Sequence, residues 1–256
     1  MPGAPPSSST GLAFSEPVPQ NRPRHPPQTV QDVMVAFASA RRMMVDGQIR
    51  TNDVTDLRIL TAFGEVPREA FVPANKADLA YLDRDLPVGG EGADRPLRYL
   101  LKPMVLAKLI HALDLGASDR VLDVGCVTGY AAAVLARLAG QIVAVEEDPA
   151  LAESATQKLH ALGCANVLVR TGPLSAGAPA DGPYDAILLE GAVELVPESL
   201  CAQLRHGGRL ACILRRGPIG KAMLYRSVAG DVSGRPLFDA AAPLLPGFVQ
   251  PPLFVF

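Results

Sequence analysis

The sequence predicts an α/β fold organised around a mostly parallel β-sheet. Three observations lead to this prediction. Residues 120–130 have the pattern of a short buried strand that is broken by glycines. An alanine-rich segment with strong helix propensity, residues 131–138, follows this turn. Apolar strands and helical segments then alternate along the chain, which is typical of parallel strands joined by right-handed crossovers.

The turn after the first strand has the features of a ligand-binding turn. Gly125 and Gly129 would let a ligand approach the backbone, where the amide groups of the following helix point at it. Asp123 stands two residues before Gly125, and the next strand ends in Glu146, 21 residues after Gly125. An acid at about that spacing meets a ribose hydroxyl in nucleotide-binding folds.

The spacing of these glycines favours S-adenosylmethionine over a dinucleotide. A dinucleotide fingerprint needs the pattern G-x-G-x-x-G, whereas this turn carries Gly125 and Gly129. Asp123 would repel a pyrophosphate, but S-adenosylmethionine has a ribose, a sulfonium and an ammonium group, and no phosphate. A nicotinamide or flavin cofactor is one alternative, and a structural βαβ unit that binds nothing is another.

Composition excludes several other classes of protein. The chain has 256 residues, 48% hydrophobic and 20% charged, with a net charge of −2, so no basic field points to nucleic acid. Four cysteines and four histidines are scattered without ligand spacing, which predicts reduced thiols and no metal site. The chain shows no apolar run of about 18 residues and no signal-peptide pattern. We therefore expect a cytoplasmic protein without a membrane partner.

The N-terminal half divides into a tail and a helical segment. Residues 1–29 contain eight of the 24 prolines and little apolar content, which predicts disorder. Residues 30–115 are expected to form an N-terminal helical cap on the substrate side. Within them we expect a helix that ends near Gly47, a second helix after Asp56, a loop over 77–96, and a helix from Pro103 to about Leu113.

Residues 116–256 are expected to form the cofactor-binding domain, in one compact unit with the cap. After the strand that ends at Glu146, a helix is predicted over 149–162 and another over 197–204. Further strands are predicted over 166–170, 184–189 and 209–214. The alternation of strands and helices then stops. Residues 222–228 and 232–238 lie on either side of Gly230-Asp231, which predicts an antiparallel hairpin at one edge of the sheet.

Several of these segments together resemble the protein-L-isoaspartate O-methyltransferases. The segments are Gly47-Gln48-Ile49-Arg50, residues 66–73 (VPREAFVP), residues 121–125 (VLDVG), residues 183–188 (PYDAIL) and residues 207–210 (GGRL). They occur in order between about Val33 and Leu214, and the C-terminal segment 235–240 (RPLFDA) is similar to the bacterial branch. The resemblance implies a Rossmann-like S-adenosylmethionine methyltransferase fold with a seven-stranded sheet.

The resemblance also implies a function. It implies transfer of a methyl group from S-adenosylmethionine to the stray carboxylate of isoaspartyl residues in damaged proteins, a repair activity. The implied cofactor-binding residues are Asp123, Gly125, Gly129, Glu146 and Gly172. Arg50, Tyr99 and Glu190 are the candidate substrate-binding residues, and Leu101 and Lys102 are the candidate catalytic positions.

The chain departs from the family pattern at four of these functional positions. Val127 replaces the middle glycine of the turn, and Pro173 replaces the acid that faces the adenine. Leu101 replaces a serine whose hydroxyl helps the transfer, and Glu190 replaces a small polar residue. The alternative is therefore a non-catalytic or substrate-altered relative that keeps the fold for ligand or protein binding.

Overall fold

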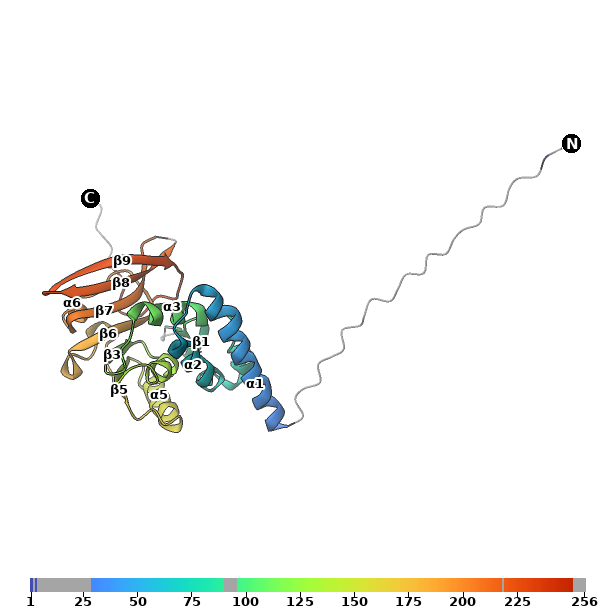
Figure 1. Cartoon of the computed structure of the whole chain (residues 1–256), viewed down its shortest axis with the longest axis horizontal. Helices are drawn as coiled ribbons and strands as arrows, with labels where there is room; N and C mark the ends of the chain where they lie inside the picture. The colour runs from blue at the N-terminus through green and yellow to red at the C-terminus, as the bar shows by residue number, and fades with distance from the viewer. Residues whose placement is uncertain (2, 4–28, 90–95, 218, 251–256) are drawn as a thin grey trace.

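The structure is a computed structural model that describes Met1, Gly3 and residues 29–89, 96–217 and 219–250. The predicted disorder of residues 1–29 falls almost entirely outside these residues. One α/β body carries a helical N-terminal segment, with helices α1 and α2 at one side and the β8–β9 hairpin at the other (Figure 1).

A seven-stranded sheet forms the centre of the molecule, in the order β5-β4-β3-β6-β7-β8-β9. The first five strands in this order, β5 to β7, pair in parallel. Strand β8 pairs antiparallel with β7, and β9 pairs antiparallel with β8. The strands are β3 (Arg120–Val124), β4 (Gln141–Glu146), β5 (Val167–Thr171), β6 (Tyr184–Val193), β7 (Leu204–Arg215), β8 (Gly220–Val228) and β9 (Asp231–Asp239). The predicted mostly parallel sheet with an antiparallel C-terminal hairpin is confirmed.

The helices and the N-terminal strands surround this sheet. The helices are α1 (Val30–Met44), α2 (Leu57–Glu65), α3 (Pro103–Leu113), α4 (Tyr130–Leu135), α5 (Pro149–Ala161) and α6 (Glu198–Cys201). Short 3₁₀ turns span Arg50–Asn52, Arg68–Phe71, Ala74–Leu79, Leu174–Ala176 and Pro179–Asp181. A separate two-stranded sheet pairs β1 (Leu86–Gly89) with β2 (Arg98–Leu100).

One N-terminal expectation is refined by the structure and one was wrong. The first α-helix ends at Met44, close to the expected end near Gly47, and a π-helical turn, Val45–Ile49, continues it and buries Val45 and Ile49. The expected loop over 77–96 contains strand β1, in which Leu86 and Val88 point into the core. Its four residues are too few for their alternation to stand out in a stretch rich in Asp, Gly and Pro.

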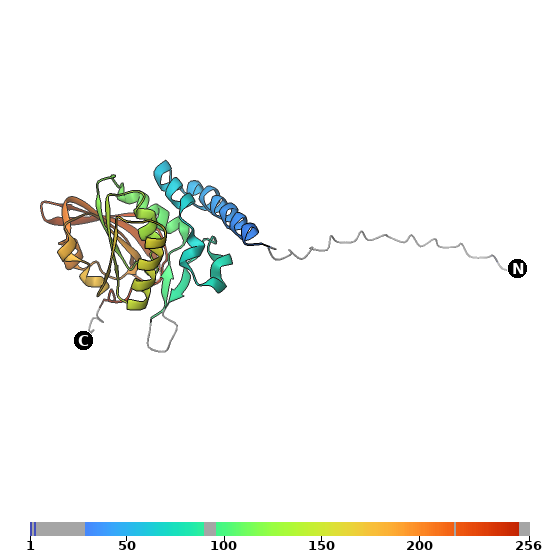
Figure 2. The same ribbon diagram turned by 90° about the horizontal axis from the view of Figure 1, so that it is seen from below.

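Alternate side chains of the parallel strands point to two apolar cores. One face packs against α2 to α5 and the N-terminal segment, which together form the larger core. The opposite face packs against Leu174, Leu200 and the C-terminal residues Leu245 and Phe248. Figure 2 shows α5 and the N-terminal helices beside the sheet. The carboxyl ends of β3, β4 and β6 therefore lie between the N-terminal and C-terminal segments.

Candidate functional site

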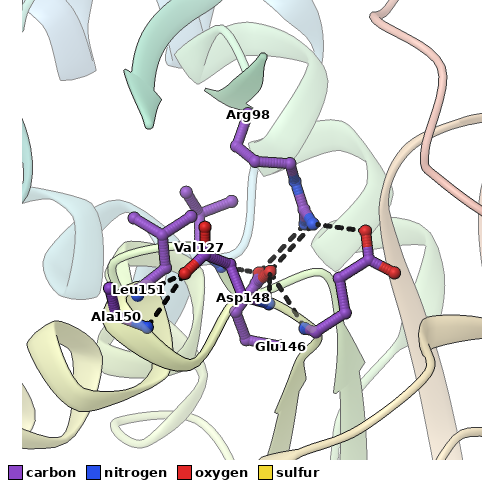
Figure 3. A network of polar contacts seen from close by, with 7 residues as sticks. Arg98, Val127, Glu146, Asp148, Ala150 and Leu151 are labelled. Atoms are coloured by element: carbon purple, nitrogen blue, oxygen red, sulfur yellow. Dashed lines mark hydrogen bonds and ion pairs between the residues drawn. The ribbon is translucent and has the colours of Figure 1, made fainter. Parts of the chain in front are cut away.

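Glu146, at the carboxyl end of β4, lies at the centre of a buried polar network (Figure 3). Its Oε1 and Oε2 accept hydrogen bonds from Arg98 Nη1 at 2.8 Å and Arg98 Nη2 at 2.9 Å. The backbone N–H groups of Val127, Glu147 and Asp148 also donate to it, at 2.9, 3.0 and 3.1 Å. Five donors therefore fill the acceptor positions of one carboxylate.

Burial raises the pKa of Glu146 above its usual value, and the Arg98 guanidinium and the amides of Val127 and Asp148 oppose that rise. The carboxylate is fully buried, and the side chain of Arg98 is only 4% exposed. A bidentate pair with two parallel N–H···O bonds holds the carboxylate ionised more strongly than a single contact would. Glu146 is thus matched in charge and in hydrogen bonds by residues of this chain.

Asp123 and Glu190 form a second buried acidic group on the neighbouring strands β3 and β6. Among the described residues, no donor reaches any of their four carboxyl oxygens. Burial raises the pKa of Asp123, and burial together with the nearby Asp123 raises the pKa of Glu190 well above its usual value. Two carboxyl groups this close and this buried do not ionise together readily, and a proton held between them is the way in which they can satisfy each other.

The glycine turn between β3 and α4 is left-handed at three positions. Gly125 and Gly129 have φ values of 87° and 91°, which glycine adopts without strain. Val127 has φ 53°, a left-handed conformation that costs a β-branched residue about 1–2 kcal/mol. A Cβ on Gly129 would lie 3.1 Å from Leu159 and 3.2 Å from Ala155, so close packing against α5 also requires glycine there.

The start of α3 brings Leu101 and Lys102 close to two acids of the preceding segment. The backbone N–H of Lys102 donates to Asp85 Oδ1 at 2.9 Å, and that of Met104 donates to Asp83 Oδ1 at 3.0 Å. Leu101 is only 1% exposed, so its side chain belongs to the core. The helix start that carries the candidate catalytic positions therefore already binds carboxylates of this chain.

The remaining candidate residues lie at different distances from the network. Tyr99 is half-buried on β2 beside Arg98. Gly172 follows β5, and its N–H donates to the backbone oxygen of Glu146 at 3.0 Å. Arg50 is exposed and pairs with Asp46 at 3.4 Å. The structure therefore brings Gly172 to the network, places Tyr99 next to Arg98 on β2, and leaves Arg50 at the surface.

Two arginines, Arg98 and Arg68, were not among the predicted site residues. Arg98 is one arginine in a stretch that also contains Arg84, Arg95 and several aspartates. Arg68 is completely buried and donates to the backbone oxygens of Ala80 and Leu101, although it sits in a recognised motif.

Leu245 comes from the far end of the chain and lies against the glycine turn. A Cβ on Gly125 would be 3.0 Å from Leu245 Cδ2 and 3.3 Å from Arg98 Nη2. A Cβ on Gly191 would be only 2.6 Å from Leu245 Cγ. Only the folded chain brings Leu245 to this turn, so local patterns could not predict it.

In the arrangement described, these residues do not fit S-adenosylmethionine. The uncompensated acids Asp123 and Glu190 suit a cationic ligand, but Glu146 has no acceptor position left for ribose hydroxyls. Arg98 and Leu245 fill the approach to Gly125, where a ligand would meet the backbone. The charges of the buried acids therefore suit this cofactor, but the side chains of Arg98 and Leu245 leave no room for it in this arrangement.

The part of the chain that the structure describes shows neither a metal cluster nor a membrane-spanning helix. No His, Cys, Asp or Glu side chains in that part of the chain gather in groups of three that could hold a metal ion. None of its helices combines the length and the apolar run that crossing a bilayer requires.

The sequence matches known methyltransferases over most of its length. A family model described as protein-L-isoaspartate(D-aspartate) O-methyltransferase matches residues 39–227. A protein-L-isoaspartate O-methyltransferase of Rhodopseudomonas palustris (strain HaA2) is 44% identical over 187 residues, 73% of each chain. One of Methylorubrum populi is 44% identical over 188 residues, 73% of this chain and 84% of that protein.

Solved structures agree with these matches. A protein-L-isoaspartate O-methyltransferase superimposes with a TM-score of 0.71 and 27% identity, covering 80% of this chain and 66% of that one. A Plasmodium falciparum structure described as a putative protein of this kind, in complex with S-adenosyl-L-homocysteine, shares the fold with a TM-score of 0.65 at 16% identity; the match covers 79% of this chain and 96% of that one. These matches favour the catalytic interpretation over the non-catalytic alternative. The chain belongs to the protein-L-isoaspartate O-methyltransferase family and is an S-adenosylmethionine-dependent methyltransferase.

Proposed function

We propose that the methyl acceptor of this enzyme is the carboxylate of an isoaspartyl residue in a damaged protein. The names of its relatives support this acceptor. In the structure, the proposal is carried by the start of α3, where two backbone amides bind carboxylate groups. Amides at a helix N-terminus favour an anion, so a substrate carboxylate is suited to the same position.

Methylation of a carboxylate depends more on positioning of the acceptor than on a strong base. A carboxylate is already ionised at pH 7, so it can attack a methyl group without first losing a proton to the enzyme. The contribution expected from the residues of this chain is therefore to position the acceptor carboxylate and to exclude water. We infer that residues 30–115 form this substrate side and that Lys102 and Tyr99, next to the start of α3, position the acceptor.

An incoming carboxylate must compete with the acids that already cap α3. Asp83 is exposed and is the easier of the two to displace, whereas Asp85 is half-buried, and burial raises the pKa of Asp85. We expect Asp83→Ala to free the Met104 amide and to lower KM for an isoaspartyl peptide. Asp78→Ala is the matched control, because Asp78 is also an exposed acid of the N-terminal segment.

The direct test compares two peptides that differ only in the linkage of one aspartate. Methyl transfer from radiolabelled S-adenosylmethionine should label the isoaspartyl peptide with a base-labile ester and leave the aspartyl peptide unlabelled. Equal labelling of both peptides, or of neither while the cofactor binds, would show that the acceptor is a different group.

We also propose that this activity takes place in the cytoplasm. All four cysteines, Cys126, Cys164, Cys201 and Cys212, are free thiols in the structure. Free thiols are typical of a reducing compartment. Fractionation of the native host with an antibody against this chain tests the assignment, and recovery in an oxidising compartment would contradict it.

A further inference from the structure

Two side chains of this protein lie where its cofactor is expected to bind. Arg98 makes two hydrogen bonds to Glu146, the predicted partner of the ribose, and leaves that carboxylate without a free acceptor position. Leu245 covers Gly125, where the cofactor would approach the backbone. A Cβ built on that one glycine would lie 3.0 Å from Leu245 and 3.3 Å from Arg98, closer than ordinary van der Waals contact.

The segment that carries Leu245 is held at the end of β6 by few polar contacts. The Ala192 N–H donates to Pro243 O at 2.8 Å, and the Leu245 N–H donates back to Ala192 O at 2.8 Å. The Glu194 N–H donates to Phe248 O at 3.0 Å, and Phe248 is buried in the smaller core. A short bridge of this kind, near the end of the described chain, can open without unfolding the sheet.

Arg98 has a second partner outside the buried network. Glu147 Oε1 lies 3.5 Å from Arg98 Nη1, and the Glu147 side chain is 32% exposed. Arg98 and Glu147 line a shallow surface cavity of about 210 Å³ together with Pro96, Asp148 and Pro149. If Arg98 leaves Glu146, its guanidinium can therefore turn toward solvent and keep an ion pair with Glu147.

We propose that this structure is the closed state of the cofactor site, in which Arg98 and Leu245 occupy the positions of the ribose and of the cofactor atoms over the glycine turn. S-adenosylmethionine then binds only when Arg98 releases Glu146 and the segment from Pro243 to Phe248 moves off Gly125. The proposal rests on the cofactor of the family and not on the identity of the methyl acceptor.

The closed state has a measurable consequence. When only a fraction of molecules is open, the apparent dissociation constant of the cofactor rises in inverse proportion to that fraction. A substitution that weakens the closed contacts without touching the cofactor's partners should therefore tighten binding. If Arg98 and Leu245 had only a structural role, their substitution would instead weaken cofactor binding, because loosening a binding site normally lowers its affinity.

The test measures S-adenosylhomocysteine binding by calorimetry with the full chain. We expect Arg98→Gln and Leu245→Ala each to lower the dissociation constant by roughly tenfold. Arg170→Gln is the control for the first, because Arg170 makes a similar two-bond pair with Asp181 at the surface, at 2.9 and 2.9 Å. Leu244→Ala is the control for the second, because Leu244 lies in the same segment but packs against the other core. Both controls should bind as the wild type does.

Hydrogen exchange on the wild-type chain gives a second readout that needs no variant. Saturating S-adenosylhomocysteine should speed exchange of the Ala192, Glu194 and Leu245 amides, because their acceptors move away. Unchanged or greater protection of these amides in the complex overturns the proposal, even if a variant fails to fold. Folded variants that bind no more tightly than wild type, or no binding by any of the proteins, also overturn it. The peptide assay reports separately on the acceptor.

Discussion

The carboxyl groups of Asp123 and Glu190 lie together in the interior, and no donor among the described residues satisfies either one. Asp123 is fully buried and Glu190 is 3% exposed. Two adjacent carboxyl groups in the protein interior do not readily ionise together. Burial of this pair therefore destabilises the fold unless one of the two groups is protonated. This arrangement makes the stability of the protein depend on pH in a defined direction.

We expect Glu190→Gln to raise the free energy of unfolding by about 1–3 kcal/mol at pH 8. Burial raises the pKa of both acids, so the folded chain holds a proton that the unfolded chain releases above about pH 4. The stability that this proton gives is present below that pH and is lost as the pH rises through the raised pKa. A glutamine amide donates to Asp123 at any pH, so the gain should be smaller at pH 5 than at pH 8.

Urea unfolding of wild type and variant at the two pH values measures this difference. Glu153→Gln is the control, because Glu153 is an exposed acid on α5. An equal effect of Glu190→Gln at both pH values would mean that the pair does not share a proton.

Arg68 should contribute strongly to stability because it joins two parts of the N-terminal segment to each other and to α4. It donates to Ala80 O at 2.8 Å and to Leu101 O at 2.7 Å, and its guanidinium carbon lies 4.6 Å from the centre of the Tyr130 ring. Arg68→Met leaves two buried carbonyl groups without donors, at a cost of about 2–4 kcal/mol. Urea unfolding checks this value, and Arg42→Met, at an exposed position of α1, should change stability little.

Gly129 should tolerate alanine less well than Gly163, although both have a left-handed backbone, with φ 91° and 68°. A Cβ at Gly129 meets α5 at 3.1 Å, whereas a Cβ at Gly163 meets nothing within 4 Å. Gly163→Ala therefore isolates the backbone cost, about 1–2 kcal/mol, and Gly129→Ala adds a packing cost of about 1–3 kcal/mol. Equal melting temperatures for the two variants would show that α5 adjusts to the extra methyl group.

The sequence predicted the sheet well because the pattern that defines it is local. Each parallel strand has a short apolar run, and Asp123, Gly125 and Glu146 stand at strand ends where chain position alone places them. Arg98 and Leu245 could not be found in the same way. Arg98 lies 48 residues before Glu146 along the chain, and Leu245 lies 99 residues after it. Only tertiary packing brings Arg98 to Glu146 and Leu245 to Gly125.

The position of the missing hydroxyl gives the last prediction. Leu101 stands where the resemblance implies a serine, and its side chain is buried in the core while its carbonyl accepts from Arg68. Leu101→Ser and Leu101→Ala remove nearly the same apolar volume, so each should cost about 2–4 kcal/mol of stability. They differ only in the hydroxyl, and a comparison between the two therefore removes the effect of packing.

We expect Leu101→Ser to transfer methyl groups to an isoaspartyl peptide several-fold faster than Leu101→Ala. A hydroxyl that donates to the reacting carboxylate or its neighbour acts in the transition state, where one donor contributes up to about 10²–10³ in rate. Initial rates, corrected for the folded fraction of each variant at the assay temperature, provide the comparison. If serine and alanine give the same rate at saturating cofactor, the hydroxyl has no part in the reaction of this chain, and Lys102, Tyr99 and the α3 amides must hold the acceptor without it.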